Sequence, residues 1–82
     1  MSFAQTEKAK AMFAEATSGE LTTSQYLKQN FKDVDSTSMH DLAVLFYRAN
    51  DYVSAGVCWE VALGKVKKHG KAYEQILNCL SA

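Results

Sequence analysis

Apolar residues recur every three or four positions along most of the chain, which is the period of an amphipathic helix. The pattern predicts five helices, at about residues 3–17, 24–32, 39–49, 52–69 and 71–80. The chain has no proline and only four glycines, and it is rich in good helix formers such as alanine, leucine and lysine. No strand pattern competes seriously with this assignment. The sequence therefore predicts an all-α fold, a small bundle of four to five helices.

Polar residues spaced three apart mark the expected beginnings of the first three helices. They are Ser2 with Gln5, Thr22 with Gln25, and Ser38 with Asp41. In the first two pairs, which form capping boxes, each side chain satisfies a backbone N–H that the helix start leaves without a partner. We expect Ser18-Gly19 to end the first helix and Gly70 to end the fourth, because glycine tolerates the left-handed conformation past a helix terminus.

The segment from Leu42 to Tyr47 is apolar on every side of the expected third helix. Its periodicity alone fits a buried strand as well as a buried helix. The start signal before it and the periodic segment after Asn50-Asp51 favour a helix. A helix that is apolar all round must be covered on more than one side.

The third and fourth helices share a pattern of small and aromatic residues that suits a close antiparallel hairpin. The pattern consists of Leu42, Ala43, Phe46, Ala55, Trp59 and Ala62. The three alanines let the two backbones approach closely, and the two aromatic rings fill the spaces between these contacts. Asn50-Asp51 supplies the tight turn that makes the helices neighbours.

This pattern resembles the tetratricopeptide repeat, a 34-residue helix–turn–helix unit, which would run here over residues 36–69. Met39 stands where the family usually has tryptophan, Ala43 where glycine is common, and Lys67 where it usually has proline. A generic helical hairpin is the alternative, since any close pair of helices needs the same alternation. Residues 71–81 would form a capping helix or the first half of a further unit. The resemblance implies a protein-binding surface on the concave side of the third helix, formed by His40, Val44, Tyr47 and Arg48.

The length and charge exclude several classes of protein. The 82 residues suit one domain, 1–82, and nine basic against nine acidic residues give no electrostatic case for nucleic acid or an acidic membrane surface. One cationic cluster, the basic patch, contains Lys65, Lys67, Lys68 and Lys71. It fits docking to an acidic peptide, RNA or lipid headgroups, or simply a solvated helix end whose cations suit the helix dipole.

The residues that carry most enzyme chemistry are too few and too scattered to form a site. His40 and His69 are the two histidines, and Cys58 and Cys79 lie twenty-one residues apart, so neither pair has the spacing of a metal motif. We expect no catalysis, no metal and no cofactor. Without a signal-peptide pattern or a long apolar run, we expect a cytoplasmic protein whose cysteines are reduced and structural.

These observations together predict a non-catalytic protein–protein interaction module, an adaptor or small chaperone-like protein. It would bind a helix or extended segment of a partner in a helical groove, as a homo- or hetero-oligomer without a membrane. One alternative is a helical homodimer with a structural or regulatory role, in which the apolar third helix packs across a two-fold axis. A small nucleic-acid-binding regulator that uses the basic patch is a further alternative.

Overall fold

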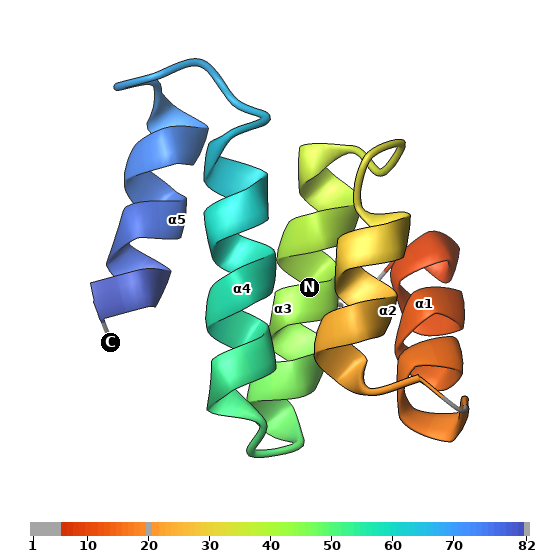
Figure 1. Ribbon diagram of the computed structural model, residues 1–82. Coiled ribbons are helices and arrows are strands. Elements are labelled where there is room, and N and C mark those ends of the chain that lie inside the picture. The colour runs from red at the N-terminus through yellow and green to blue at the C-terminus, as the bar shows by residue number, and fades with distance from the viewer. Residues whose placement is uncertain (1–5, 20, 82) are drawn as a thin grey trace.

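The computed structural model describes residues 6–19 and 21–81, and these residues form a bundle of five helices. The helices are α1 (Glu7–Ser18), α2 (Thr23–Asn30), α3 (Ser36–Arg48), α4 (Tyr52–Leu63) and α5 (Lys71–Ser81). Helices α1, α3, α4 and α5 pack side by side in that order, and α2 packs against α1 and α4 (Figure 1). The prediction of an all-α bundle is confirmed. Over the described part of the chain, no helix is long and apolar enough to cross a membrane.

Helix α1 begins later than the sequence pattern predicts. Thr6 has an extended backbone, and its hydroxyl accepts a hydrogen bond from the Ala9 N–H at 3.1 Å, which makes Thr6 the N-cap. The extended backbone of Thr6 rules out the predicted unbroken helix over residues 3–17, whereas Phe3 itself and the expected Ser2–Gln5 capping box lie outside the described residues. The Thr6 N–H donates to the Asp41 carboxylate at 3.0 Å, so the same residue ties the start of α1 to α3.

The other two predicted start signals have different outcomes. The Thr22–Gln25 capping box is present, with both reciprocal hydrogen bonds formed. Helix α3, by contrast, is capped by Asp35, whose carboxylate accepts from the N–H and the hydroxyl of Ser38 at 3.3 and 2.7 Å. These hydrogen bonds favour the ionised carboxylate and lower the pKa of Asp35. The predicted cap at Ser38 is wrong because Asp35 reaches the same backbone one turn earlier.

Helix α4 ends at Leu63, six residues before the predicted end of the helix at His69. The Gly64 N–H bonds to the carbonyls of Glu60 and Val61, which tightens and closes the last turn. The chain then makes a turn in which the Gly70 N–H donates to the Lys67 carbonyl at 3.0 Å, with a positive φ of 65° at His69. The prediction that Gly70 caps α4 is therefore wrong: Gly64 caps α4, and Gly70 directly precedes α5. The basic patch therefore starts in a loop rather than in the last turn of a helix.

A three-residue turn joins α3 and α4 into a tight hairpin. Asn50 has a positive φ of 67°, and the N–H groups of Asn50 and Asp51 bond back to the carbonyls of Tyr47 and Phe46. This is the arrangement of a Schellman motif, which satisfies the last carbonyls of α3. The Asp51 carboxylate then caps α4 by accepting from the N–H of Ser54. Asn50-Asp51 therefore makes the predicted turn.

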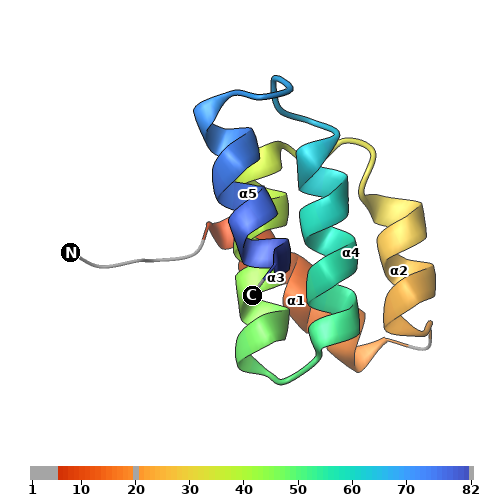
Figure 2. The ribbon, with the colours of Figure 1, turned by 90° about the vertical axis from the view of Figure 1, so that its left-hand side faces the viewer.

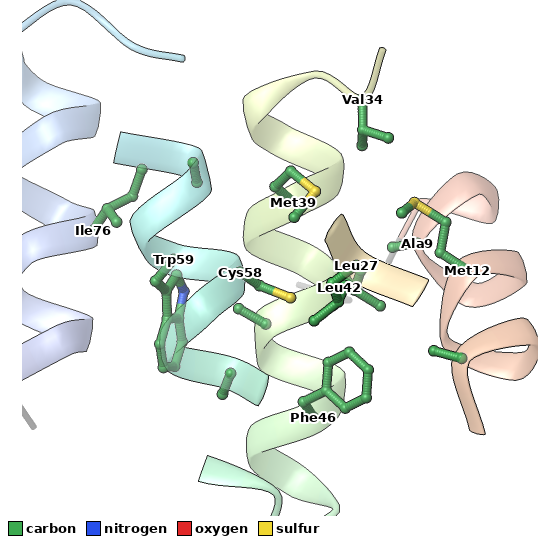
Figure 3. Close-up of a cluster of buried hydrophobic side chains, with 14 residues drawn as sticks. Ala9, Met12, Leu27, Val34, Met39, Leu42, Phe46, Cys58, Trp59 and Ile76 are labelled. Carbon is green, nitrogen blue, oxygen red and sulfur yellow. The ribbon is translucent and has the colours of Figure 1, made fainter. Parts of the chain in front are cut away.

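The core of the bundle lies between α3 and its neighbours (Figure 3). Ala43, Ala55 and Ala62 are fully buried, as the close hairpin requires. The Phe46 ring lies on the α1 side of α3, 5.1 Å from the ring of Phe13. Helix α3 is therefore covered by α4 on one side and by α1 on another. This agrees with the prediction that a helix apolar all round is covered on more than one side.

Candidate functional site

Helices α3 and α5 begin at the same end of the molecule and lie on one side of α4 (Figure 2). Two hollows open between them, and together we name them the α3–α5 groove. The aromatic hollow, about 270 Å³, is lined by Tyr47, Tyr52, Gly56, Trp59, Cys79 and Leu80. The His40 hollow, about 130 Å³, is lined by Ser36, Thr37, His40, Val66, Ala72, Gln75 and Ile76. Residues of α3 and α5 line both hollows, and α4 forms the floor of the aromatic hollow.

The aromatic hollow forms where Gly56, which has no side chain, lies between the large side chains of Tyr52 and Trp59 on α4. Tyr52, Gly56 and Trp59 are spaced four and three apart, which places them on one face of the helix. A Cβ built at Gly56 would meet no atom within 4 Å, so the space beside its backbone is open. A leucine or larger side chain at this position would point into the hollow and reduce its volume.

Aromatic rings from two helices meet at this hollow. The ring centroid of Tyr47 on α3 lies 5.0 Å from that of Tyr52 and 5.8 Å from that of Trp59, both on α4. These separations are in the favourable range for tilted and edge-to-face pairs. Tyr47 and Tyr52 remain 44% and 57% exposed, whereas Trp59 is 6% exposed. The hollow therefore has a buried aromatic floor and exposed aromatic rims.

A hydrogen bond fixes the floor of the groove. The Trp59 indole Nε1–H donates to His40 Nδ1 at 3.0 Å, across the hairpin. Because Nδ1 accepts, the neutral His40 ring carries its proton on Nε2. His40 lines one hollow and Trp59 lines the other, so this pair lies between the two. The donor of a buried indole is satisfied, and its ring is held in one orientation.

The four residues expected to form a binding stripe on α3 have different surroundings. His40 and Tyr47 line the groove, one in each hollow. Val44 is half-buried and packs against the core. Arg48 is exposed in the last turn of α3 and lines neither hollow. The structure thus brings two of the four to the groove.

Several residues that line the groove are not predicted from the sequence. The sequence pattern does not predict Tyr52, Gly56, Cys79 or Leu80 as site residues, and it places Trp59 in the packing between the two helices of the hairpin. The sequence does contain a signal for three of these residues. Gly56 is a small residue between two aromatic residues, Tyr52 and Trp59, on one face of a helix, and such a pattern indicates a hollow between the rings. Cys79 and Leu80 carry no such signal, because their place depends on how α5 docks on α4.

The basic patch is split by the fold. Lys67, Lys68 and Lys71 are exposed in the loop and at the start of α5. Lys65 is half-buried, and its ammonium donates to the backbone carbonyl of Lys32, just after α2, at 3.3 Å. The patch therefore has three exposed members next to the groove, and a fourth that contacts another part of the bundle.

Comparisons with protein-family models, with curated proteins and with solved structures find no match for this chain. The lining of the groove combines aromatic, aliphatic and a few neutral polar side chains, a composition typical of sites that bind apolar groups and orient them with hydrogen bonds.

The two cysteines provide a probe of the groove, because their environments differ. Burial, with a smaller contribution from the charge of Asp51, raises the pKa of Cys58 to about 12. Cys79 is half-buried and lines the aromatic hollow. Since the thiolate is the reactive form, iodoacetamide at about pH 8 is expected to alkylate Cys79 and spare Cys58 in the folded protein.

Mass spectrometry of the digested protein measures this difference directly. In concentrated urea, where the chain is unfolded, both cysteines should react at similar rates. Equal alkylation of both cysteines in the folded protein would contradict the burial of Cys58 between α3 and α4.

Proposed function

We propose that this protein is a non-catalytic protein–protein interaction module that holds a segment of its partner in the α3–α5 groove. The observation that carries the proposal is the aromatic hollow, a cavity with a rigid tryptophan floor and exposed tyrosine rims. Tryptophan and tyrosine contribute most of the binding energy at many protein interfaces, because they bury a large area and lose little side-chain entropy.

The distribution of exposed apolar side chains supports this site. Four large apolar residues of the described chain are exposed, namely Leu21, Tyr47, Tyr52 and Val53. Three of them lie within residues 47–53, at the end of the hairpin that borders the aromatic hollow. A single exposed apolar residue is ordinary, but a cluster beside a cavity is typical of an interaction surface.

We further propose that the hairpin of residues 36–69 is tetratricopeptide-like. Two observations support this. The six positions that carry the resemblance are all buried, namely Leu42, Ala43, Phe46, Ala55, Trp59 and Ala62. From α3 onwards each helix also packs on the next, α3 on α4 and α4 on α5, as helices of such arrays do, whereas α2 lies outside this order and packs against α1 and α4. Helix α5 then takes the place of a capping helix.

The role that follows is that of an adaptor or a small chaperone-like protein, since modules of this family act in those ways. A cytoplasmic location is part of the same proposal, and two free cysteines fit it. The alternative of a homodimer rested on the apolar third helix. Helices α1 and α4 cover that helix within one chain, so this observation is explained without a second copy.

A selection from a library of random peptides tests the proposal. We expect peptides that bind the protein to bind the Tyr47→Ser variant about tenfold more weakly, because the change removes an aromatic rim of the hollow. Leu21→Ser is the matched control, since Leu21 is nearly as exposed as Tyr47, 41% against 44%, and lies in the connection between α1 and α2. Isothermal titration calorimetry measures both affinities.

Two results would overturn the proposal. One is a selection that yields no peptide above background. The other is a set of peptides whose affinity falls equally in the Leu21→Ser and Tyr47→Ser variants, or only in the former. Peptide protection of Cys79 from alkylation would be a second, independent sign that the aromatic hollow is occupied.

A further inference from the structure

The hydrogen bond between Trp59 and His40 depends on the protonation state of one ring. The indole Nε1–H of Trp59 is a donor that cannot become an acceptor, and it donates to His40 Nδ1 at 3.0 Å. A neutral imidazole has one nitrogen with a free lone pair, whereas both nitrogens of a protonated imidazole carry hydrogens. Protonated His40 therefore offers the indole no acceptor, and no rotation of the ring restores one.

The His40 ring is accessible to protons from solvent, although its partner is buried. His40 is half-buried and lines the His40 hollow, whereas Trp59 is 6% exposed. The side chains that line this hollow together with His40 carry no charge, namely Ser36, Thr37, Val66, Ala72, Gln75 and Ile76. Among the described residues that line the hollow, histidine is the one side chain type whose charge changes between about pH 5 and 8.

The charged residues around the His40 hollow are of both signs. Within the described part of the chain, those that directly adjoin a lining residue in the sequence are Asp35, Asp41, Glu74, Lys65, Lys67 and Lys71. The carboxylates of Asp35 and Asp41 accept from backbone N–H groups, and the Lys65 ammonium donates to a backbone carbonyl. Neither sign of charge is in excess here, so the hydrogen bond to Trp59 is the specific contact that protonation of His40 removes.

The titratable groups beside Trp59 keep their charge over the same range of pH or point to solvent. On α4, burial raises the pKa of Cys58 to about 12, so its thiol stays neutral at pH 8 and below. Glu60, on the other side of Trp59 in the sequence, is exposed. The ring of Tyr47 on α3 contacts that of Trp59, and phenols titrate near pH 10 in water.

We propose that His40 and Trp59 form a pH-sensitive switch that fixes the indole ring at neutral pH and releases it in mild acid. The proton comes from solvent and binds the Nδ1 lone pair that the indole N–H occupied. Two N–H groups then face each other across the hairpin, and the rings must move apart. The buried indole donor can be satisfied again only by another acceptor, such as water that enters from the hollows.

Release of Trp59 changes the aromatic hollow, because the indole is its floor. The Trp59 ring centroid lies 6.2 Å from that of His40 and 5.8 Å from that of Tyr47, an exposed rim of the hollow. Movement of the indole away from His40 therefore alters its contact with Tyr47. This consequence rests on the proposed function: a bound segment would meet a fixed floor at neutral pH and a loose floor in acid.

Spectra of the ¹⁵N-labelled protein without any peptide test the switch. At pH 8, the ring nitrogens of His40 should show the tautomer with the proton on Nε2. Between pH 8 and 5, the indole N–H signal of Trp59 should shift and follow the titration of the His40 ring. The other tautomer at pH 8, or an indole signal that stays in place while His40 titrates, would overturn the proposal.

Matched variants assign the response to one histidine. In His40→Asn, the side-chain carbonyl lies close to the position of Nδ1 and accepts at every pH, so the indole signal should no longer shift; His40→Gln is a second variant of this kind. The control is His69→Asn, which removes the other histidine and suits the positive φ of 65° at that position. It should keep the full shift. An indole signal that shifts as much in both His40 variants as in the original protein would contradict the switch.

Peptides from the selection described above extend the test to binding. From pH 8 to pH 5, the affinity of the original protein should fall about fivefold more than that of His40→Asn, because binding must order the loose floor again. The same peptide is used with both proteins, so its own titration cancels in this comparison. An equal pH dependence in the two proteins would show that the release of Trp59 does not reach the hollow.

The outcomes separate the switch from the proposed function. If no peptide binds but the indole signal shifts as predicted, the switch stands and the binding groove is wrong. If peptides bind in a manner that depends on Tyr47 while the indole signal stays in place across the titration, the groove stands and the switch is wrong.

Discussion

Replacing Trp59 by alanine is expected to lower the free energy of unfolding by about 3–5 kcal/mol. The side chain is 6% exposed and lies between α3, α4 and the groove, so its removal leaves a large cavity in a small core. The change also deprives His40 Nδ1 of its hydrogen-bond donor, which is the indole N–H at 3.0 Å.

An effect of this size is a large part of the total stability, which for a domain of this length is on the order of 4–12 kcal/mol. Urea denaturation followed by circular dichroism measures it, because the variant has lost the only tryptophan fluorophore. Tyr52→Ala is the control: that ring is 57% exposed, and its loss should cost well under half as much. An unchanged urea midpoint for Trp59→Ala would contradict the burial of the Trp59 side chain in the core.

Replacing Ala55 by leucine is expected to destabilise the protein by about 1–3 kcal/mol through overpacking. Ala55 is fully buried where α4 faces α3, and Ala43 of α3 is buried as completely. The additional atoms of leucine have no space there unless the helices separate, and their separation would also loosen the surroundings of Cys58.

A thermal melt compares this variant with Ala14→Leu, a control in which the same substitution is made at an exposed position of α1. The control should change the stability by no more than about 0.5 kcal/mol. If Ala55→Leu melts at the temperature of the original protein, the close approach of α3 and α4 is wrong.

The sequence predicts the helices well because each depends mainly on its own residues. The five helices, the Thr22–Gln25 capping box and the Asn50-Asp51 turn are all local patterns, and all are present. The errors lie at ends where several signals compete. Thr6 and Asp35 cap their helices in place of equally plausible neighbours, because tertiary contacts such as the Thr6–Asp41 hydrogen bond help to select among them.

The end of α4 is another helix end that local sequence signals do not decide. Gly64 and Gly70 are both plausible places for a helix to end, and the cations between them fit the last turn of a longer helix. The earlier end is the observed one, and the chain then turns at His69 to dock α5 on α4. Docking of α5 is a long-range event that no local pattern reports.

The candidate site depends on that docking and was therefore only partly predicted. The face of α3 that carries His40 and Tyr47 follows from helical periodicity alone. The opposite wall, with Cys79 and Leu80, follows from where the 64–70 loop returns the chain. Predicting the role of Trp59 would need both the helical periodicity and the docking of α5. Its side chain packs in the core of the hairpin and also forms the floor of the aromatic hollow.

The most direct test of the binding groove is the indole N–H resonance of Trp59. The chain has one tryptophan, so its side chain gives a single indole N–H signal in an amide correlation spectrum of the ¹⁵N-labelled protein. On addition of a peptide from the selection, we predict that this signal shifts, together with the amides of Gly56 and Leu80, while the amide of Leu21 stays in place. A bound peptide that leaves the Trp59 signal unmoved and shifts the amides of α1 and α2 instead would contradict the account.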